Sequence, residues 1–318
     1  MQALVLEDST VAVRDVPVPE PGAGEALVRV QMAGVCNTDV EIARGYMGFS
    51  GVLGHELYGV VEACEDNPAL VGKRVAGEIN QACAACPMCE RGLGRHCPAR
   101  TVMGILHKDG CFAEHVTLQQ ACLHPLPEAL EDARACFVEP TAAAFEVLEQ
   151  VPVSDRDRIA VLGDGKLGLL IGQVLATTGA TPTLVGRHER KLSLARAQGA
   201  RTAALDALDD NTFDVVIEAT GSPAGMEAAI RLTRPRGTLV LKSTYHGPLE
   251  LDAAPLVIDE LTVVGSRCGP FEPALRALAT GAVDPDAMVD AIYPLAQAAE
   301  ALERAQQPGV LKVLLDMR

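Results

Sequence analysis

Tryptophan is absent from this sequence, and other aromatic residues are few. The 318 residues include only four tyrosines and six phenylalanines, so any core must be built mainly from valine, leucine, alanine and isoleucine. Hydrophobic residues still make up 48% of the chain and charged residues 22%, a balance typical of folded proteins and unlike that of disordered ones. The length suits two domains of ordinary size, each with its own core.

Positive charge is also scarce. Lysine and arginine number 27 against 42 aspartate and glutamate residues, which gives a formal net charge of -15. No basic run is present that could neutralise a phosphate backbone. The composition therefore argues against nucleic acid as a partner.

Long apolar runs are missing as well. No stretch approaches the roughly 18 apolar residues of a membrane-spanning helix. The opening residues, MQALVLEDSTVAV, predict a strand and a turn rather than a signal peptide. We therefore expect a cytoplasmic protein with no membrane partner. Disulfides are rare in that compartment, so the ten cysteines point first to metal binding.

The chain divides by composition into two domains. Residues 1–148 are rich in glycine, proline and short strand-like runs such as Ala26–Met32, which predicts a mostly β domain with long loops. Residues 270–318 end on an apolar strand, Val310–Leu315, and we expect them to return to this first domain.

Residues 149–269 alternate between short apolar runs and helical segments. This alternation predicts an α/β fold with a doubly wound parallel sheet covered by helices on both faces. The predicted strands are Arg158–Leu162, Thr181–Val185, Val215–Glu218, Thr238–Lys242 and Leu261–Val264, and the first two predicted helices are Leu169–Thr178 and His188–Gln198.

Four cysteines gather in the segment CAACPMCERGLGRHC. Four thiolates on one compact loop suit a closed, tetrahedral and therefore structural zinc site, whose metal would stabilise a lobe that has almost no apolar core. The alternatives are an iron–sulfur cluster, a disulfide pair or a set of unrelated free thiols. The predicted ligands are Cys83, Cys86, Cys89 and Cys97.

A second set of ligand types is spread more widely. Cys36 stands in GVCNTD, His55 and Glu56 in GHE, and Glu139 in FVEPTAAAF. One thiolate, one imidazole and one carboxylate would hold zinc with a position left open for water or substrate. Zinc at such a site acts as a Lewis acid on an alcohol or a carbonyl. Taken singly, each of these residues could equally have a structural role.

A glycine-rich motif, GDGKLG, lies between a predicted strand and a predicted helix. Gly163 would allow the tight turn, Gly165 the approach of a pyrophosphate and Gly168 close packing of helix against strand. The motif alone is weak, but its place within a strand–helix–strand unit predicts a dinucleotide site. An ordinary glycine-rich turn is the alternative.

Taken in order, these motifs resemble the zinc-dependent alcohol dehydrogenases of the medium-chain dehydrogenase/reductase superfamily, and CxTDxE resembles their glucose-dehydrogenase branch, among the sugar and polyol dehydrogenases. The resemblance implies a Rossmann domain plus a mostly β, GroES-like catalytic domain. It implies that Cys36, His55 and Glu139 bind the catalytic zinc and that Glu56 is a switching ligand.

The same resemblance assigns roles to three residues of one short segment. Thr38 would take the proton from the bound alcohol, and Asp39 would orient the imidazole that binds zinc. Many members of the family carry histidine where Glu41 stands. Glu41 could still pass a proton to solvent, or it could be a solvated helix residue.

The cofactor is expected to be a nicotinamide dinucleotide, with NADP preferred over NAD. The position of the acid that accepts ribose hydroxyls in NAD sites is Gly186, and Arg187 follows it with a guanidinium suited to a phosphate. In the alternative, Arg187 is solvated and NAD binds, which nearby Glu189 would support. Further contacts are predicted from Thr141, by resemblance, and from Thr220 and Ser243, which follow later strands.

The sequence thus predicts an oxidoreductase that interconverts an alcohol, polyol or sugar and its carbonyl form. A zinc-free quinone or enoyl reductase of the same superfamily is one alternative, and a non-catalytic zinc- or nucleotide-binding protein is another. We expect a homodimer or homotetramer. The segment Gly45–Val52 is expected to line the substrate cleft, but it does not identify the substrate.

Overall fold

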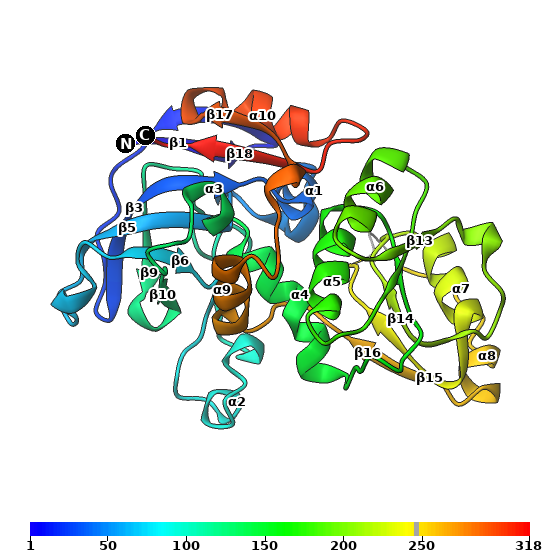
Figure 1. Ribbon diagram of the computed structural model, residues 1–318. Coiled ribbons are helices and arrows are strands. Elements are labelled where there is room, and N and C mark those ends of the chain that lie inside the picture. The colour runs from blue at the N-terminus through cyan, green and yellow to red at the C-terminus, as the bar shows by residue number, and fades with distance from the viewer. Residues whose placement is uncertain (245–247) are drawn as a thin grey trace. The chain divides into compact units, whose positions relative to one another are not determined.

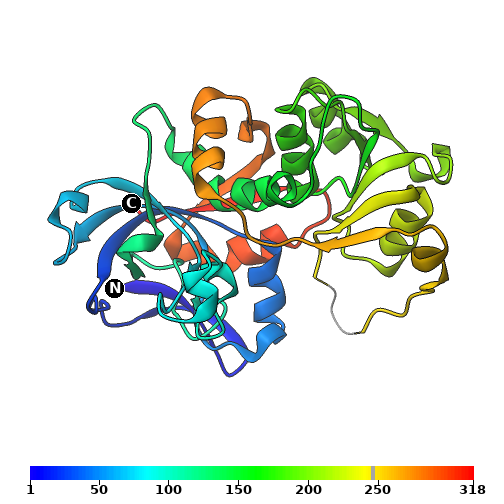
Figure 2. The same cartoon turned by 90° about the horizontal axis from the view of Figure 1, so that it is seen from below.

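The computed structural model describes residues 1–244 and 248–318 and divides into two compact units (Figure 1). The first comprises Met1–Glu139 and Pro285–Arg318, and the second Pro140–Asp284. The sequence-based boundaries were 148/149 and 269/270. Helix α4 (Val138–Gln150) continues through the first of these positions without a break. Both ends of the chain lie in the first unit (Figures 1 and 2).

The first unit is built mainly of strands. Its largest sheet has the order β10-β6-β5-β3-β18-β17, with β9 also paired to β3. Its strands are β3 (Glu25–Gly34), β5 (Glu56–Ala63), β6 (Arg74–Gly77), β9 (His115–Gln119), β10 (Leu123–Pro125), β17 (Val289–Pro294) and β18 (Lys312–Asp316). The last part of the chain enters this sheet because β18 pairs antiparallel with β3.

Smaller elements complete this unit. A three-stranded sheet has the order β2-β1-β4, and β7 pairs with β8. Short helices join the strands. Their bounds are β1 (Gln2–Glu7), β2 (Thr10–Asp15), β4 (Gly51–Val52), β7 (Asn80–Gln81), β8 (Thr101–Val102), α1 (Asn37–Ala43), α2 (Pro87–Glu90), α3 (Asp132–Ala135) and α10 (Ala298–Ala305).

The second unit contains a six-stranded sheet in the order β13-β12-β11-β14-β15-β16, and every neighbouring pair is parallel. Numbered along the chain, this is the strand order 3-2-1-4-5-6 of a Rossmann fold. The strands are β11 (Ile159–Leu162), β12 (Thr183–Val185), β13 (Arg201–Ala203), β14 (Phe213–Glu218), β15 (Thr233–Leu241) and β16 (Thr262–Gly265).

Helices cover both faces of this parallel sheet, with α5 and α7 on opposite sides in Figure 1. The helices of this unit that follow α4 are α5 (Lys166–Ala176), α6 (Glu189–Ala197), α7 (Pro223–Leu232), α8 (Ala254–Ile258) and α9 (Phe271–Thr280). All four residues of β11 are buried because a central parallel strand packs against helices on both faces. The predicted fold class, a Rossmann domain with a mostly β domain, is confirmed.

The predicted strands and helices of the second unit are present with shifted ends. The largest shift is that of β15, which begins at Thr233 rather than Thr238. The short strand β13 (Arg201–Ala203) was missed because its three residues contain one small apolar side chain and none is fully buried. A strand at the sheet edge carries little of the apolar pattern that reveals central strands.

Within residues 1–244 and 248–318, no helix has the length and apolar character needed to cross a membrane.

Candidate metal and dinucleotide sites

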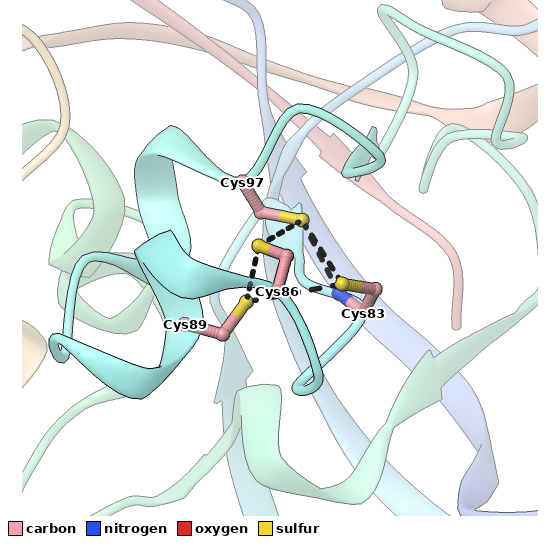
Figure 3. A group of neighbouring side chains, drawn as sticks. All are labelled: Cys83, Cys86, Cys89 and Cys97. Atoms are coloured by element: carbon pink, nitrogen blue, oxygen red, sulfur yellow. Dashed lines mark hydrogen bonds between the residues drawn. The ribbon is translucent and has the colours of Figure 1, made fainter.

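The four cysteines of the predicted closed site converge in the segment between β7 and β8 (Figure 3). Their sulfur atoms are separated by 3.4 Å (Cys83–Cys97), 3.5 Å (Cys86–Cys89), 3.8 Å (Cys86–Cys97) and 4.0 Å (Cys83–Cys89). Zinc–sulfur bonds of about 2.3 Å in a tetrahedron require sulfur atoms about 3.8 Å apart. The residues present therefore fit a tetrahedral zinc ion.

The local structure of this lobe also suits a metal. Cys97 is fully buried, and the backbone N–H of Cys83 donates to its sulfur at 3.5 Å. This hydrogen bond lowers the pKa of the Cys97 thiol, which favours the thiolate form that binds metal. Ala84 has a left-handed backbone (φ 58°), a strained conformation for alanine.

Three residues of the predicted open site also come together. Ligand atoms of Cys36, His55 and Glu56 all lie within 4.8 Å of one another. Cys36 is the residue before α1, His55 precedes β5, and Glu56 is the first residue of that strand. The Oε1 atom of Glu56 is buried without a hydrogen-bond partner among the described residues. An unsatisfied carboxylate oxygen beside a thiol and an imidazole fits a zinc ion.

Asp39 holds two parts of this cluster in place. Its Oδ2 accepts a hydrogen bond from the backbone N–H of Cys36 at 2.8 Å, and its Oδ1 lies 2.9 Å from Nδ1 of His55. Burial lowers the pKa of His55, but the charge of Asp39 and its hydrogen bond outweigh burial, and the pKa is raised well above its ordinary value. With Nδ1 directed at Asp39, Nε2 is the nitrogen left for a metal.

Glu56 has a partner that the sequence reasoning missed. The Nζ atom of Lys312 forms an ion pair with Oε2 of Glu56, and both side chains are 1% exposed. The ammonium group also lies 5.4 Å from the centre of the Phe137 ring. A β-carbon at Gly34 would stand 2.3 Å from Glu56 Oε2, so glycine is required there. A lysine inside the apolar run VLKVLLD was the available signal.

Of three other predicted residues, one contacts this cluster. Thr38 is half-buried, with its Oγ1 3.7 Å from the sulfur of Cys36. Glu41 forms an ion pair with Arg44 at 2.9 Å. Glu139 is half-buried in the first turn of α4, and the compact group formed by Cys36, His55 and Glu56 does not include it.

The glycine-rich loop has the form needed to bind a pyrophosphate. Gly163 has φ 113°, and a β-carbon there would lie 2.7 Å from the carbonyl oxygen of Ala219. A β-carbon at Gly168 would lie 2.0 Å from the carbonyl oxygen of Gly163. Gly165 stands at the N-terminus of α5, and a β-carbon there would meet nothing within 4 Å. This open space before a helix N-terminus fits an anion.

The side chains of the other predicted cofactor contacts differ in burial and in hydrogen bonding. The hydroxyl of Thr220 donates to the buried carboxylate of Glu218 at 2.5 Å. The hydroxyl of Thr141 is buried with no hydrogen-bond partner among the described residues, so it remains able to bind a ligand. Ser243 is half-buried, with its Oγ 3.9 Å from where a β-carbon of Gly221 would be.

The turn after β12 contains Gly186 and Arg187. The Arg187 side chain is exposed, and its guanidinium has no ion pair within the described part of the chain. The backbone N–H groups of Arg187 and His188 both donate to Asp164 at 2.8 Å. Sequence reasoning did not single out Asp164, which stands between the first two glycines of GDGKLG.

Two family descriptions match the chain. The alcohol dehydrogenase GroES-like domain matches residues 22–128, and the zinc-binding dehydrogenase domain matches residues 167–280. A sorbitol dehydrogenase of Halalkalibacterium halodurans is 28% identical over 326 residues, which cover 96% of this chain and 95% of the relative.

Solved structures similar to this chain include complexes with both nicotinamide cofactors. A zinc-binding dehydrogenase from Sinorhizobium meliloti bound to NADP has 30% identity and a TM-score of 0.90, with 99% of this chain and 98% of that chain covered. An alcohol dehydrogenase from E. coli CFT073 complexed with NADH has 27% identity and a TM-score of 0.91, with 100% and 99% covered.

Proposed function

Because this chain belongs to the zinc-binding dehydrogenase family that carries the alcohol dehydrogenase GroES-like domain, we propose that it oxidises the hydroxyl group of a polyol or sugar alcohol, or reduces the matching carbonyl, with NADP preferred over NAD. The resemblance noted from the sequence is confirmed. The protein is an oxidoreductase of the alcohol dehydrogenase type.

The observation that carries the proposal is the cluster of Cys36, His55 and Glu56. Its ligand types suit a zinc ion with an open position, whereas a zinc-free reductase needs no such set. A non-catalytic binding protein would not need the Thr38 hydroxyl beside it. We propose one zinc here and one on the four cysteines.

Each protein group then has a chemical task. Cys36, His55 and Glu139 hold the catalytic zinc in this proposal, and Glu56 is a ligand that can exchange with substrate or water. Zinc supplies Lewis acidity that lowers the pKa of a bound alcohol. The Thr38 hydroxyl accepts the alcohol proton. Asp39 keeps Nε2 of His55 free for the metal.

Glu41 is the proposed outer end of the proton path. Its carboxylate is partly exposed and paired with Arg44, so a proton that reaches it can pass to solvent. A nicotinamide dinucleotide bound to this chain would supply the hydride chemistry at the substrate carbon.

The dinucleotide is proposed to lie along Gly163, Gly165 and Gly168, with its pyrophosphate at the N-terminus of α5. Gly186 offers no acid of its own, and the Arg187 guanidinium, which has no ion pair among residues 1–244 and 248–318, can bind a 2′-phosphate. These features support the preference for NADP. We further propose that Thr141, Thr220 and Ser243 contact the cofactor.

Substitution of Thr38 tests the proton path. Thr38→Val removes the hydroxyl while keeping the shape of the side chain, so kcat for alcohol oxidation should fall by about a hundredfold. Zinc content should stay unchanged, because Thr38 is not a ligand. Thr10→Val on the exposed part of β2 is the matched control. Equal turnover in the two variants would remove Thr38 from the mechanism.

The substrate class is tested by direct assay. A panel of polyols, sugars and simple alcohols is offered with NADP or NAD, and reduced cofactor is followed by absorbance. The relative named as a sorbitol dehydrogenase supports the choice of polyols. Turnover of at least one polyol above the simple alcohols is expected. Zinc-containing protein that is inactive on the whole panel would contradict the proposal.

We also propose a cytoplasmic protein that forms a homodimer or homotetramer. None of the ten cysteines, all of them among the described residues, forms a disulfide, which suits a reducing compartment. The sheet edge at β16 supports association, because Val257 and Ile258 of nearby α8 are each 77% exposed. Light scattering measures the assembly size.

A further inference from the structure

The side chain of Asp164 reaches from the glycine-rich loop to the turn that follows β12. Its Oδ2 accepts hydrogen bonds from the backbone N–H groups of Arg187 and His188, each at 2.8 Å. Nδ1 of His188 lies 3.0 Å from both carboxylate oxygens. Asp164 is only 8% exposed, so these contacts fix its carboxylate at the end of β12.

This carboxylate occupies the place that a side chain at position 186 would take. A β-carbon built on Gly186 would lie 2.5 Å from both Cβ and Oδ2 of Asp164 and 2.7 Å from its Cγ. Dinucleotide folds that select NAD carry an acid at the end of the second strand, where it accepts hydrogen bonds from the ribose. Here the second strand is β12, and the acid reaches its end from the first loop.

The carboxylate remains charged at neutral pH. Burial raises the pKa of Asp164, but the hydrogen bonds from His188 and Arg187 outweigh it, and the net effect is a lowered pKa. Among the described residues, the His188 ring is the one hydrogen-bond partner of its Oδ1 atom, so Oδ1 keeps a lone pair for a hydroxyl donor.

We propose that Asp164 is a specificity-determining residue that supplies the acid missing at Gly186. Its Oδ1 accepts a hydrogen bond from the 2′-hydroxyl of NAD and repels the 2′-phosphate of NADP. The inference rests on the proposed dinucleotide site and deepens it. Asp164 and Arg187 then act in opposite directions: Arg187 favours NADP, and Asp164 keeps NAD usable, so the preference for NADP is moderate.

The test compares binding of NADH and NADPH to the zinc-loaded protein by fluorescence titration, which does not depend on turnover. Asp164→Asn should raise the ratio of NADPH to NADH affinity by about tenfold or more, the size expected for one hydrogen bond to a charged group. Arg187→Ala should lower the same ratio. The ratio of kcat/KM values with one substrate should follow both changes.

The matched control is Asp214→Asn. Asp214 also accepts a backbone N–H, from Arg158 at 2.7 Å, and also has a lowered pKa, but it lies at the opposite end of the parallel sheet. Asp214→Asn should leave the ratio of NADPH to NADH affinity unchanged.

A double variant that moves the carboxylate from position 164 to position 186 tests whether its place at the end of β12, and not a change in protein stability, sets the ratio. Asp164→Gly combined with Gly186→Asp returns a carboxylate to the end of β12 by the usual route and removes the 2.5 Å clash. The double variant should recover a ratio near that of the unchanged protein. This arm remains informative if Asp164→Asn folds poorly, because the swap restores a carboxylate beside the same two N–H groups.

The outcomes separate the two proposals. A protein that binds neither NADH nor NADPH would overturn the proposed dinucleotide site together with this inference. A protein that binds them with a ratio unchanged in Asp164→Asn would overturn the role of Asp164 alone. A swap variant that strongly favours NADPH would do the same.

Discussion

Replacing Cys36 with serine, or His55 with alanine, is expected to abolish turnover while the protein stays folded and keeps about one zinc ion per chain. Either change removes a ligand from the open cluster, whose ligand atoms lie within 4.8 Å of one another. A zinc ion held by these residues would supply the Lewis acidity that lowers the pKa of the alcohol, so the loss of a ligand should abolish oxidation. Elemental analysis measures the zinc content, circular dichroism the fold and the absorbance assay the turnover.

Cys89→Ser is the variant for comparison, because it removes one thiol from the four-cysteine site instead of the open cluster. The lobe has little apolar core to hold it, so loss of its metal should lower the yield of folded protein or its Tm. Unchanged stability in Cys89→Ser would contradict a structural zinc there. Active protein with no metal at all would refute the zinc mechanism as a whole.

Lys312→Met should lower the free energy of unfolding by about 3–5 kcal/mol, because it leaves the Glu56 carboxylate buried without its partner charge. Both side chains are 1% exposed, so water cannot take the place of the ammonium group. Urea unfolding at fixed zinc concentration measures the change.

The double variant Lys312→Met with Glu56→Gln is the control for this effect. In the double variant no unpaired carboxylate is left buried at position 56, so most of the stability lost in Lys312→Met should return. If the double variant unfolds at the same urea concentration as Lys312→Met, the buried charge is not the cause.

The pH dependence of the stability that the Lys312–Glu56 ion pair contributes follows from the pKa of Lys312. Burial lowers the pKa of Lys312, but the charge of Glu56 outweighs burial, and the pKa is raised above its ordinary value. A raised pKa in the folded state means that stability is fully present below the ordinary lysine pKa. It is lost as the pH rises through the folded value, at strongly alkaline pH.

Local spacing in the sequence was enough to predict the features whose residues lie close together along the chain. Four cysteines within one short segment can reach one metal ion whatever the rest of the fold does. The GDGKLG loop likewise connects a strand directly to a helix, so its tight turn and its open helix N-terminus are local properties. The alternation of strands and helices predicted the parallel sheet because buried strands and amphipathic helices have different apolar periods.

Only the tertiary structure brought together residues that are far apart in the chain. Lys312 lies 256 positions from Glu56, and it reaches that carboxylate because β18 pairs with β3 and Gly34 leaves the space. Asp164 lies 23 positions from Arg187, and the parallel pairing of β11 with β12 sets their two loops side by side. The sequence alone therefore predicted an empty acid position at Gly186. The sheet register fills that position from another loop, because hydrogen bonding between strands places residues by their position in the sheet and not by their distance along the chain.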